Sequence, residues 1–434
     1  MGEAIKRLVA CFDGTWNTER SNTNVSRLFR QIADETTGSR EQRRFYDEGV
    51  GTRWGERVGG GVFGIGLDRN IRQGFAWLGS QFALAASEAT DADGFLLGPD
   101  VYIFGFSRGA FTARSLGGLI NYLGLPKLGS LEPPDPNAKT HEDPAVLRAW
   151  DLYVARPTAA EREQAKGKAA GDPLVQRINQ HDADVAAYRA ANGYHPVRIH
   201  FLGVWDTVGA LGIPRIFDNL SFFRPSTKYR FHDTRLGRCV RFAYHAAAID
   251  EQRESYCVTL WTGSEATTIE VEQRWFPGAH ADVGGGYEDD LLPDPPLAWM
   301  ASKAAEKGLH FINDRALVDP ATSLPYSSID RPPAAFDLDG REYLSPVHDS
   351  YAEFVGGVYR ILRSIPGAGG RVFRRMLVAQ DGIDQTVDPV ANQKLAADSG
   401  YRPPNLAQAG RLDVSYNVAY LDQSDPGAAE AAKT

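Results

Sequence analysis

The stretch DVYIFGFSRGAFTARSLGGLI, residues 100 to 120, decides the fold. Its first part, Asp100 to Phe106, is an apolar run rich in aromatic and β-branched residues, which predicts a buried strand. From Ala110 onward the apolar residues continue in a helical pattern. The joint between the two, Gly105-Phe106-Ser107-Arg108-Gly109, is a G-x-S-x-G pattern, which places a serine on a sharp strand-to-helix turn.

Ser107 is therefore the candidate nucleophile of this chain. Small residues beside such a serine let the backbone pass close by, and the helix that follows points its first N–H groups at the site, where they favour developing negative charge. The alternative interpretation is a serine that only caps the helix. The apolar strand before the motif and the apolar helix after it favour the nucleophile.

Strands alternate with helices over the first three hundred residues on either side of this motif. Further strands are expected at 7–12, 44–50, 197–204 and 270–276, the last of these closing the core. Helical patterns begin near Asn24 and near Asp68, and others cover 234–248 and 294–307, whereas the glycine-rich stretch 55–66 is expected to hold no regular element. This order predicts an α/β fold of α/β-hydrolase type, with a mostly parallel central sheet and helices on both faces.

The composition of the chain changes in three places, which predicts its organisation. Residues 6–310 are expected to form the catalytic domain, with a partly helical, cap-like insertion at about 126–195, where Pro, Ala, Lys, Glu and Asp are frequent and buried-strand runs are lacking. Residues 311–425 are expected to be a C-terminal extension that packs on this core. The tail, 426–434, has the composition of a disordered segment.

A serine nucleophile needs a base, and the base needs an orienting acid, in the chain order Ser, Asp or Glu, His for an α/β-hydrolase. Asp206 directly follows the strand 197–204 and is the candidate acid, with a turn-shaping aspartate as the alternative. His280, in a glycine-rich loop after the strand 270–276, is the candidate base. His348 is its main rival, whereas His245 is expected to lie inside a helix and serve packing.

Backbone N–H groups are expected to form an oxyanion hole beside the nucleophile. Arg108, the residue after the serine, would supply one donor, and the turn Gly14-Thr15 after the first strand would supply the other. Asp13 and Asp282 are candidates for substrate or loop support. An ordinary turn is the alternative interpretation of residues 13 to 15.

Composition excludes several classes of protein. The 434 residues carry a net charge of −8 and no basic stripe, which argues against nucleic-acid binding. The three cysteines form no C-x-x-C pair, and no metal-ligand spacing occurs, so neither a metal nor a cofactor is expected. No signal peptide or apolar run of 18 residues is present, which predicts a protein that is cytoplasmic as made, with signal-independent export left open.

Six motifs in this order carry a family resemblance: FDGTWN, YDEGVGT, GFSRGAFTARSLGGLI, FLGVWDTVGALG, HAAAIDEQRE and WFPGAHADVGGGY. Together they resemble an α/β-hydrolase family, named for an uncharacterised domain, that includes the first lipase class of type VI secretion effectors, which are bacterial phospholipases. The resemblance covers about residues 6 to 310. It implies a triad of Ser107, Asp206 and His280 and the hydrolysis of acyl esters, although the chain is shorter than many of the effectors.

The sequence thus predicts a serine hydrolase of carboxylic esters, most of all a phospholipase or lipase. A soluble housekeeping esterase acting on a small or polymeric ester and a catalytically silent binding module are the alternatives. Expected partners are a lipid or small ester and, as the resemblance implies, a secretion-system or immunity protein. Peripheral membrane contact is considered at 61–66, 220–223 and 351–362, for which packing inside the protein is the alternative.

Overall fold

The computed structural model describes the following residues: 6–14, 17–18, 20–33, 42–49, 62–85, 88–128, 143–209, 234–253, 256–264, 270–287, 291–312, 336–349, 373–379, 383, 385–401, 403, 406 and 416–422. Thr15, the apolar segments 220–223 and 351–362, and the tail 426–434 lie outside these residues, as does Gly61 of the segment 61–66.

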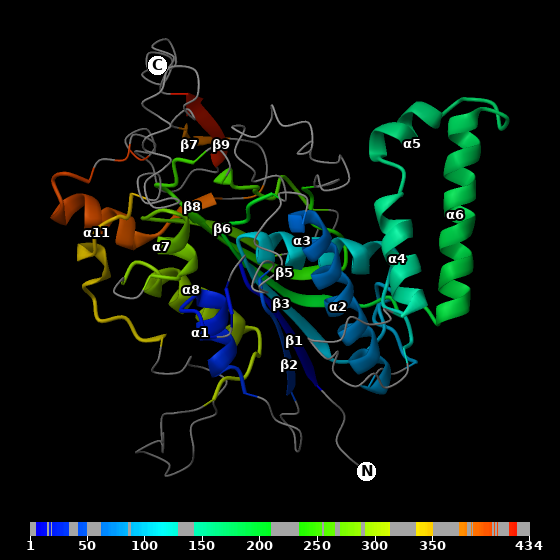
Figure 1. Ribbon diagram of the computed structural model, residues 1–434, viewed down its shortest axis with the longest axis horizontal. Coiled ribbons are helices and arrows are strands. Elements are labelled where there is room, and N and C mark those ends of the chain that lie inside the picture. The colour runs from blue at the N-terminus through cyan, green and yellow to red at the C-terminus, as the bar shows by residue number, and fades with distance from the viewer. Residues whose placement is uncertain are drawn as a thin grey trace.

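A single seven-stranded sheet organises the described part of the chain (Figure 1). Its strands run in the order β2-β1-β3-β4-β5-β6-β8, and every neighbouring pair is parallel. The strands are β1 (Arg7–Phe12), β2 (Gln42–Asp47), β3 (Asp100–Phe106), β4 (Ile199–Trp205), β5 (Val240–Ala248), β6 (Glu270–Phe276) and β8 (Gln385–Val387). The expected parallel α/β architecture is confirmed.

Helices cover both faces of this sheet because alternate strand residues point to opposite sides. Leu8 and Ile103 pack in one apolar cluster with α2 (Val62–Ala85) and α3 (Arg108–Leu123). Val9 and Phe104 pack in a second cluster with α1 (Asn24–Gln31) and α8 (Asp294–Glu306). The strands are therefore buried on both sides, as parallel strands usually are.

The predicted cap-like insertion contains three helices that stand beside α2 and α3 (Figure 1): α4 (Pro144–Val154), α5 (Ala159–Ala165) and α6 (Pro173–Asn192). Each begins at a capping residue. Asp143 and Asp172 accept backbone N–H bonds at the starts of α4 and α6, and Thr158 forms a capping box with Glu161 at the start of α5. Trp150 of α4 belongs to the apolar cluster under α3, so this insertion is anchored to the core.

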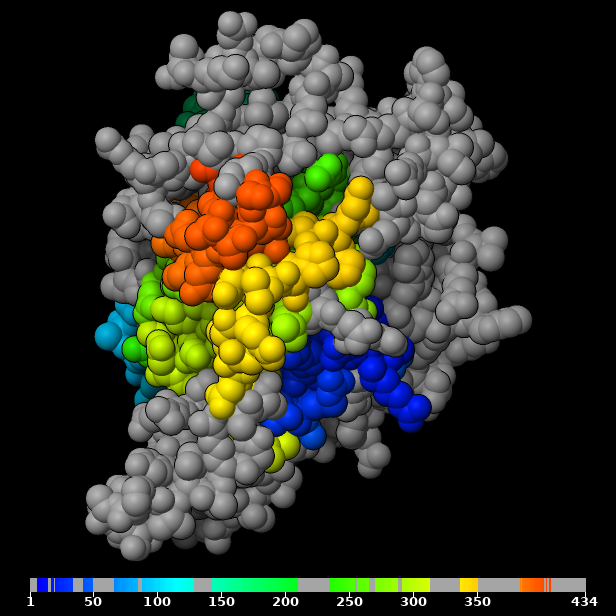
Figure 2. All heavy atoms as spheres, turned by 90° about the vertical axis from the view of Figure 1, so that its left-hand side faces the viewer, coloured from blue at the N-terminus to red at the C-terminus, as the bar shows by residue number. Residues whose placement is uncertain are grey.

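Segments from the C-terminal third of the chain contribute to two apolar clusters: Phe336 belongs to the second cluster, and Ala391 packs with Trp275 of β6 in a third. Figure 2 shows α11 (Pro389–Ala397) and residues 336–349, which include the 3₁₀ turn Glu342–Leu344, on one face of the molecule. The buried Lys394 of α11 donates hydrogen bonds to the carbonyl oxygens of Tyr343 and Ser345, which join the two segments. A separate antiparallel pair is formed by β7 (Phe373–Ala379) and β9 (Tyr416–Asp422).

Three expectations about the elements are wrong. The range 234–248, expected as a helix, contains β5, because a central strand buried on both faces has a continuous apolar sequence rather than an alternating one. The strand 270–276 is not the last strand of the sheet, because β8 pairs with its outer edge. With three residues, β8 is too short to show a recognisable sequence pattern. The glycine-rich stretch 55–66 was expected to hold no regular element, but α2 begins within it, at Val62.

No helix in the described part of the chain has both the length and the apolar content needed to span a bilayer.

Candidate active site

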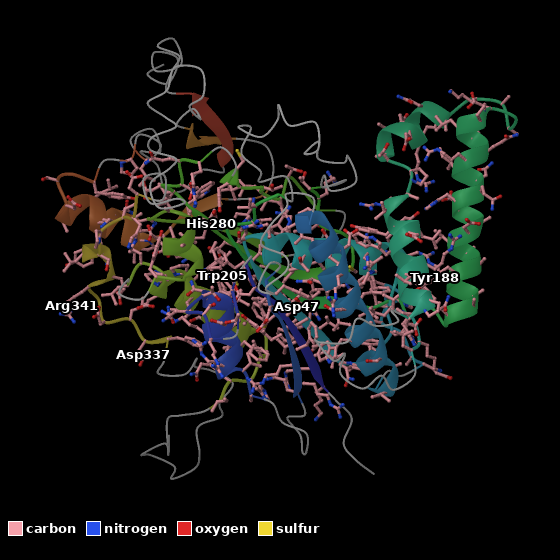
Figure 3. All side chains as sticks on the ribbon, viewed as in Figure 1. Asp47, Tyr188, Trp205, His280, Asp337 and Arg341 are labelled. Atoms are coloured by element: carbon pink, nitrogen blue, oxygen red, sulfur yellow. The ribbon has the colours of Figure 1, made fainter. Side chains whose placement is uncertain are left out.

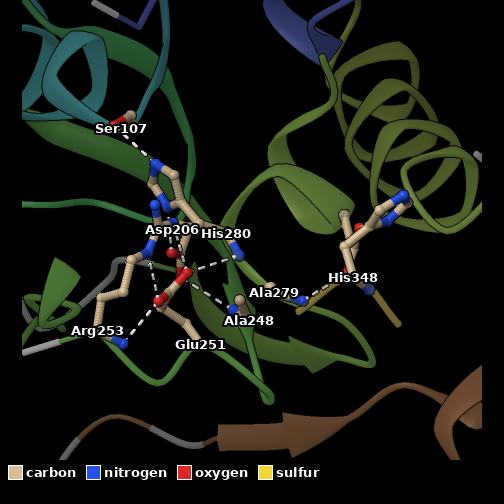
Figure 4. Close-up of polar contacts among 9 residues, drawn as sticks. Ser107, Asp206, Ala248, Glu251, Arg253, Ala279, His280 and His348 are labelled. Atoms are coloured by element: carbon tan, nitrogen blue, oxygen red, sulfur yellow. Dashed lines mark hydrogen bonds and ion pairs between the residues drawn. The ribbon is translucent and has the colours of Figure 1, made fainter. Parts of the chain in front are cut away.

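Four strand ends bring polar residues to the same edge of the sheet. Ser107 follows β3, Asp206 follows β4, His280 lies four residues beyond β6, and Asp13 follows β1. Since these strands are all parallel, their carboxyl ends share one edge, where ligands of open α/β sheets bind. Figure 4 shows Ser107, His280 and Asp206 in one line of contacts at this edge.

Ser107 sits on a strained turn between β3 and α3. Its backbone has φ 58° and ψ −120°, a conformation that L-residues rarely adopt. The turn requires its glycines, because a Cβ on Gly109 would lie 2.2 Å from the carbonyl oxygen of Phe12 and one on Gly105 would lie 2.4 Å from that of Gly109. The backbone N–H of Ser107 donates to the Trp205 carbonyl at 3.0 Å. The sequence motif thus produces the sharp turn that such a nucleophile needs.

A chain of two short hydrogen bonds links the serine to a carboxylate. The Nε2 atom of His280 lies 2.7 Å from the Oγ atom of Ser107, and its Nδ1 atom lies 2.6 Å from the Oδ2 atom of Asp206. The other carboxylate oxygen of Asp206 accepts the N–H of Ala248 at 2.9 Å, and the residue is fully buried. All three predicted residues therefore converge, with the ring between the hydroxyl and the carboxylate.

His280 lies inside the described structure (Figure 3), in an enclosed, partly aromatic setting. Burial lowers the pKa of its imidazole, and the hydrogen bond that the ring donates to Asp206 opposes that shift. The ring of Phe106 lies 4.7 Å from the His280 ring, and Tyr256 approaches it edge-on at 4.9 Å. A lowered pKa keeps the ring neutral near pH 7, the protonation state that can accept a proton from a hydroxyl.

A buried ion pair holds the backbone of His280, and the sequence did not predict it. Glu251 accepts the backbone N–H of His280 at 3.2 Å through Oε2. The guanidinium of Arg253 holds the same carboxylate in two hydrogen bonds of 2.8 Å and lies 3.5 Å from the centroid of the Tyr256 ring. Both residues belong to the motif HAAAIDEQRE, which could have indicated them. Because the first part of this motif was expected to be helical, the sequence did not predict a strand end there.

Two more carboxylates fix the loop that carries His280. Asp250 accepts the N–H of Gly278 at 2.7 Å, and Asp282 accepts the N–H of Ala279 at 2.8 Å. Gly278 has φ 112°, which favours glycine there. The loop between β6 and α7 (His280–Gly284) is therefore restrained at three successive N–H groups by three buried or partly buried carboxylates.

The rival histidine, His348, and the histidine expected to serve packing, His245, lie elsewhere. The Nδ1 atom of His348 lies 2.6 Å from Asp282, and its ring stacks on Tyr287 at 3.8 Å, so it contacts the back of the loop (Figure 4). His245 is fully buried in β5, where its Nε2 atom accepts the N–H of Thr207 at 3.2 Å.

Asp13 occupies the end of β1, close to the serine. Its carboxylate accepts hydrogen bonds from Thr23 and Tyr46, at 2.6 and 2.5 Å, and from the N–H of Gly14 at 2.6 Å. Burial raises the pKa of Asp13 to about 6 in spite of these donors.

The predicted oxyanion donors are only partly described. A Cβ added to Gly14 would lie 3.4 Å from the Cβ of Ser107, so this turn borders the nucleophile, although its N–H already donates to Asp13. Arg108 opens α3, where the first N–H groups of a helix have no partner within the helix. Thr15 lies outside the described residues. Among these residues, no group of three or more His, Cys, Asp or Glu side chains is placed to hold a metal ion.

Comparison with known proteins assigns this chain to a family. Residues 6–303 match the family described as "T6SS, Phospholipase effector Tle1-like, catalytic domain", which covers more than half of the chain. The chain belongs to this family. The match spans all the strands from β1 to β6 and therefore includes Ser107, Asp206 and His280.

Individual relatives of this family member are distant. An uncharacterised protein of Saccharomyces cerevisiae, YEL023C, is 26% identical over 414 residues, which cover 88% of this chain and 52% of the yeast protein. The chain thus spans about half the length of the curated relative that it matches.

Two solved structures are also similar. An uncharacterised protein from Pseudomonas aeruginosa is 17% identical with a TM-score of 0.37, covering 71% of this chain and 47% of the other. The Tle1 effector, solved bound to the VgrG spike of the type VI secretion system, is 15% identical with a TM-score of 0.35, covering 66% and 52%.

Proposed function

We propose that this chain is a serine hydrolase that cleaves the acyl esters of phospholipids, with Ser107 as nucleophile, His280 as base and Asp206 as orienting acid. The observation that carries the proposal is the continuous hydrogen-bonded line from the Ser107 hydroxyl through the imidazole to a fully buried carboxylate. The strained backbone of Ser107 supports it, because strain of this kind concentrates at functional sites.

The proposed reaction begins with proton transfer from the hydroxyl of Ser107 to the Nε2 atom of His280 as the serine oxygen attacks the ester carbonyl. Asp206 accepts a hydrogen bond from the Nδ1–H group of the ring, which selects the tautomer with a free Nε2 lone pair and stabilises the imidazolium that forms. The imidazolium then gives its proton to the leaving alcohol. Water, activated by the same histidine, releases the acyl group and restores the serine.

Stabilisation of the oxyanion is assigned to backbone N–H groups at the start of α3, beginning with Arg108. The positive end of the helix macrodipole adds to this effect. The turn Gly14-Thr15 remains the proposed second donor, and Thr15 is favoured over Gly14 because the Gly14 N–H is engaged by Asp13.

The substrate class and the delivery route are proposed from family membership. A Tle1-like catalytic domain favours a phospholipid over a small soluble ester. The same description favours export by a type VI secretion system. A secretion-spike protein and a neutralising immunity protein are the proposed partners, and a bacterial source is part of the same proposal.

The test compares wild type with Ser107→Ala, using a fluorophosphonate probe and vesicles of phosphatidylethanolamine and phosphatidylglycerol. We expect wild type to be labelled and to release fatty acid, and Ser107→Ala to do neither while keeping its circular dichroism spectrum. Labelling with turnover of short-chain esters but not of vesicles would favour the soluble esterase instead. A folded wild type that neither reacts with the probe nor hydrolyses any ester would refute the proposal and favour a binding module.

A further inference from the structure

Two segments from the C-terminal third of the chain reach the loop that carries His280. One contains His348, and the other, which follows α11, contains Tyr401. Both residues lie beyond 6–303, the range that matches the catalytic domain of the family. Each contacts a carboxylate that also accepts a backbone N–H group of the loop. Each segment is therefore joined to the loop through one shared carboxylate.

Asp282 joins the loop to the segment that contains His348. Its Oδ2 atom accepts the N–H groups of Ala279 and of His348, at 2.8 and 3.1 Å. Its Oδ1 atom lies 2.6 Å from the Nδ1 atom of the His348 ring, which is the donor here because a carboxylate accepts hydrogen bonds. The ring also stacks on Tyr287, with 3.8 Å between the centroids. A fully buried carboxylate thus receives a charge-assisted hydrogen bond from a side chain whose ring is fixed by stacking.

Asp250 joins the loop to Tyr401 in the same manner. Its Oδ2 atom accepts the N–H of Gly278 at 2.7 Å and the hydroxyl of Tyr401 at 2.9 Å. Tyr401 is buried, and its burial together with the charge of Asp250 raises the pKa of the phenol. The hydroxyl therefore keeps the proton that it donates. A single oxygen atom connects the backbone of the loop to this side chain.

Lys394 of α11 makes the two segments one unit. Its ammonium group donates to the carbonyl oxygens of Tyr343 and Ser345, and it lies 5.3 Å from the centroid of the Tyr401 ring. Figure 2 shows α11 and residues 336–349 side by side. One buried cation therefore contacts both the segment that contains His348 and the ring of Tyr401.

This unit is anchored on the strands that lead into the candidate active site. Ala391 of α11 packs in one apolar cluster with Trp275 of β6 and with Ile249. Trp275 lies at the end of the strand that precedes the loop, and Ile249 directly precedes Asp250. The donors from the C-terminal segments are therefore held by the same packing that holds the base of the loop.

The N–H groups that these carboxylates accept belong to the two residues immediately before His280. Gly278 and Ala279 lie between the end of β6 and the imidazole. Their position therefore helps to decide whether the ring stands 2.7 Å from the hydroxyl of Ser107 and 2.6 Å from Asp206. A displacement of about 1 Å at a reacting group can cost on the order of 10²-fold in rate.

We propose that His348 and Tyr401 are positioning residues for His280. Each acts through the carboxylate that it contacts, Asp282 or Asp250, and this inference rests on the proposed function, in which His280 is the base. The C-terminal segments thereby belong to the candidate active site, although both act through the loop. The loop keeps its carboxylates in place only while these donors are present.

The test measures kcat and KM of the full chain for a short-chain ester, at a temperature well below the unfolding transition of every variant. His348→Leu removes the ring donor. His348→Asn restores a donor, because its amide nitrogen is as many bonds from the Cα atom as the Nδ1 atom of histidine is. The control in the same segment is Arg341→Gln, which removes a surface ion pair with Asp339 at a side chain that is 72% exposed.

Tyr401→Phe removes only the hydroxyl group that Asp250 accepts. Its matched control is Tyr244→Phe. Tyr244 is also buried, and its hydroxyl also donates to a carboxylate, that of Glu270, at 2.7 Å. Glu270 is the first residue of β6, so this control removes the same kind of hydrogen bond at the opposite end of the strand from the loop.

We expect kcat to fall about tenfold in His348→Leu and about threefold in Tyr401→Phe, while KM changes by less than about twofold, because these variants displace the base and not the substrate. His348→Asn should recover most of the loss. Tyr244→Phe and Arg341→Gln should keep the wild-type kcat, although Tyr244→Phe is expected to lower the melting temperature as much as Tyr401→Phe does.

A wild-type kcat in both His348→Leu and Tyr401→Phe would overturn the proposal and leave the proposed function standing. Equal losses of kcat in Tyr401→Phe and Tyr244→Phe would also overturn it, because they would indicate a general effect of stability. A loss in His348→Leu as large as that in His280→Ala would overturn it too, since His348 would then be the base itself. A folded wild type without any esterase activity would refute the proposed function, and this inference with it.

Discussion

The two ends of α3 border different sets of charged residues. At its start, each of two buried carboxylates has matched donors: Asp206 has His280 and Ala248, and Glu251 has Arg253 and the His280 backbone. Towards its other end, a cavity of about 300 Å³ is lined by Arg114, Arg156, Arg162 and Arg235, with Asp68 as the carboxylate of its described lining. A site that performs chemistry on a neutral ester needs its charges satisfied before the substrate arrives, since unsatisfied groups would move or attract water.

The largest effect is expected at the most enclosed of these carboxylates. Asp206→Asn keeps the size of the side chain and an oxygen for the N–H of Ala248, but its amide cannot hold His280 in the required tautomer. We expect kcat for a short-chain ester to fall by about 10³-fold to 10⁴-fold, with the melting temperature nearly unchanged. Steady-state kinetics and circular dichroism measure both. A kcat within a few-fold of the wild-type value would show that the charged carboxylate of Asp206 is not needed for catalysis.

A smaller effect is expected from the ion pair behind the histidine. Glu251→Gln leaves the buried Arg253 cation without its carboxylate, so the free energy of unfolding should fall by about 3–5 kcal/mol. The double variant Glu251→Gln with Arg253→Met removes both charges and should recover a large part of that loss. Urea denaturation of these two variants and of Arg253→Met alone gives the free energies of unfolding for a double-mutant cycle. A loss in the double variant equal to the sum of the losses in the two single variants would mean that the charges do not interact.

The smallest of the three effects concerns Asp13, whose pKa burial raises in spite of its hydrogen-bond donors. Because its pKa is raised in the folded chain from 3.8 to about 6, the folded state keeps a proton that the unfolded state releases in this window. Its contribution to stability is complete below pH 4 and is lost as the pH rises through 6, a change on the order of 3 kcal/mol.

Urea denaturation at intervals from pH 3.5 to 7 tests this sign. Asp13→Asn should abolish that part of the pH dependence, whereas Asp184→Asn, at an aspartate whose pKa is lowered by Gln180 and Arg148, should not. Parallel pH curves for wild type and Asp13→Asn would contradict a raised pKa.

The sequence predicts a shared position for three residues because each lies beyond a recognisable strand. Ser107 and Asp206 come directly after the apolar strands β3 and β4, and His280 lies four residues beyond β6, so parallel strands deliver all three to one edge. Glu251 and Arg253 also follow a strand, but the alanine-rich sequence VRFAYHAAA has the composition of a helix, and only tertiary burial makes it β5. The sequence therefore did not predict that Glu251 lies at the same edge of the sheet as the candidate catalytic residues.

The arginine-lined cavity was beyond the reach of sequence patterns for a different reason. Arg114 lies inside an apolar helix, Arg156 in a connection between helices and Arg235 in a loop, with over a hundred residues between the first and the last. No local spacing joins them, because the insertion is brought to α3 by packing of Trp150 and its neighbours. The membrane-contact hypothesis stays a prediction for 220–223 and 351–362, which lie outside the described residues.

The position of β8 at the end of the sheet has a consequence for how the chain folds as it is made. Its partner β6 ends at Phe276, but β8 begins only at Gln385, and Gln385 accepts the indole N–H of the buried Trp275 at 2.9 Å. During synthesis, β6 therefore emerges more than a hundred residues before the strand that covers it, with its backbone donors and acceptors open to pairing with another nascent chain. A polypeptide that stops after α8 would contain Ser107, Asp206 and His280 yet keep this edge bare, and we expect it to aggregate where the longer chain folds.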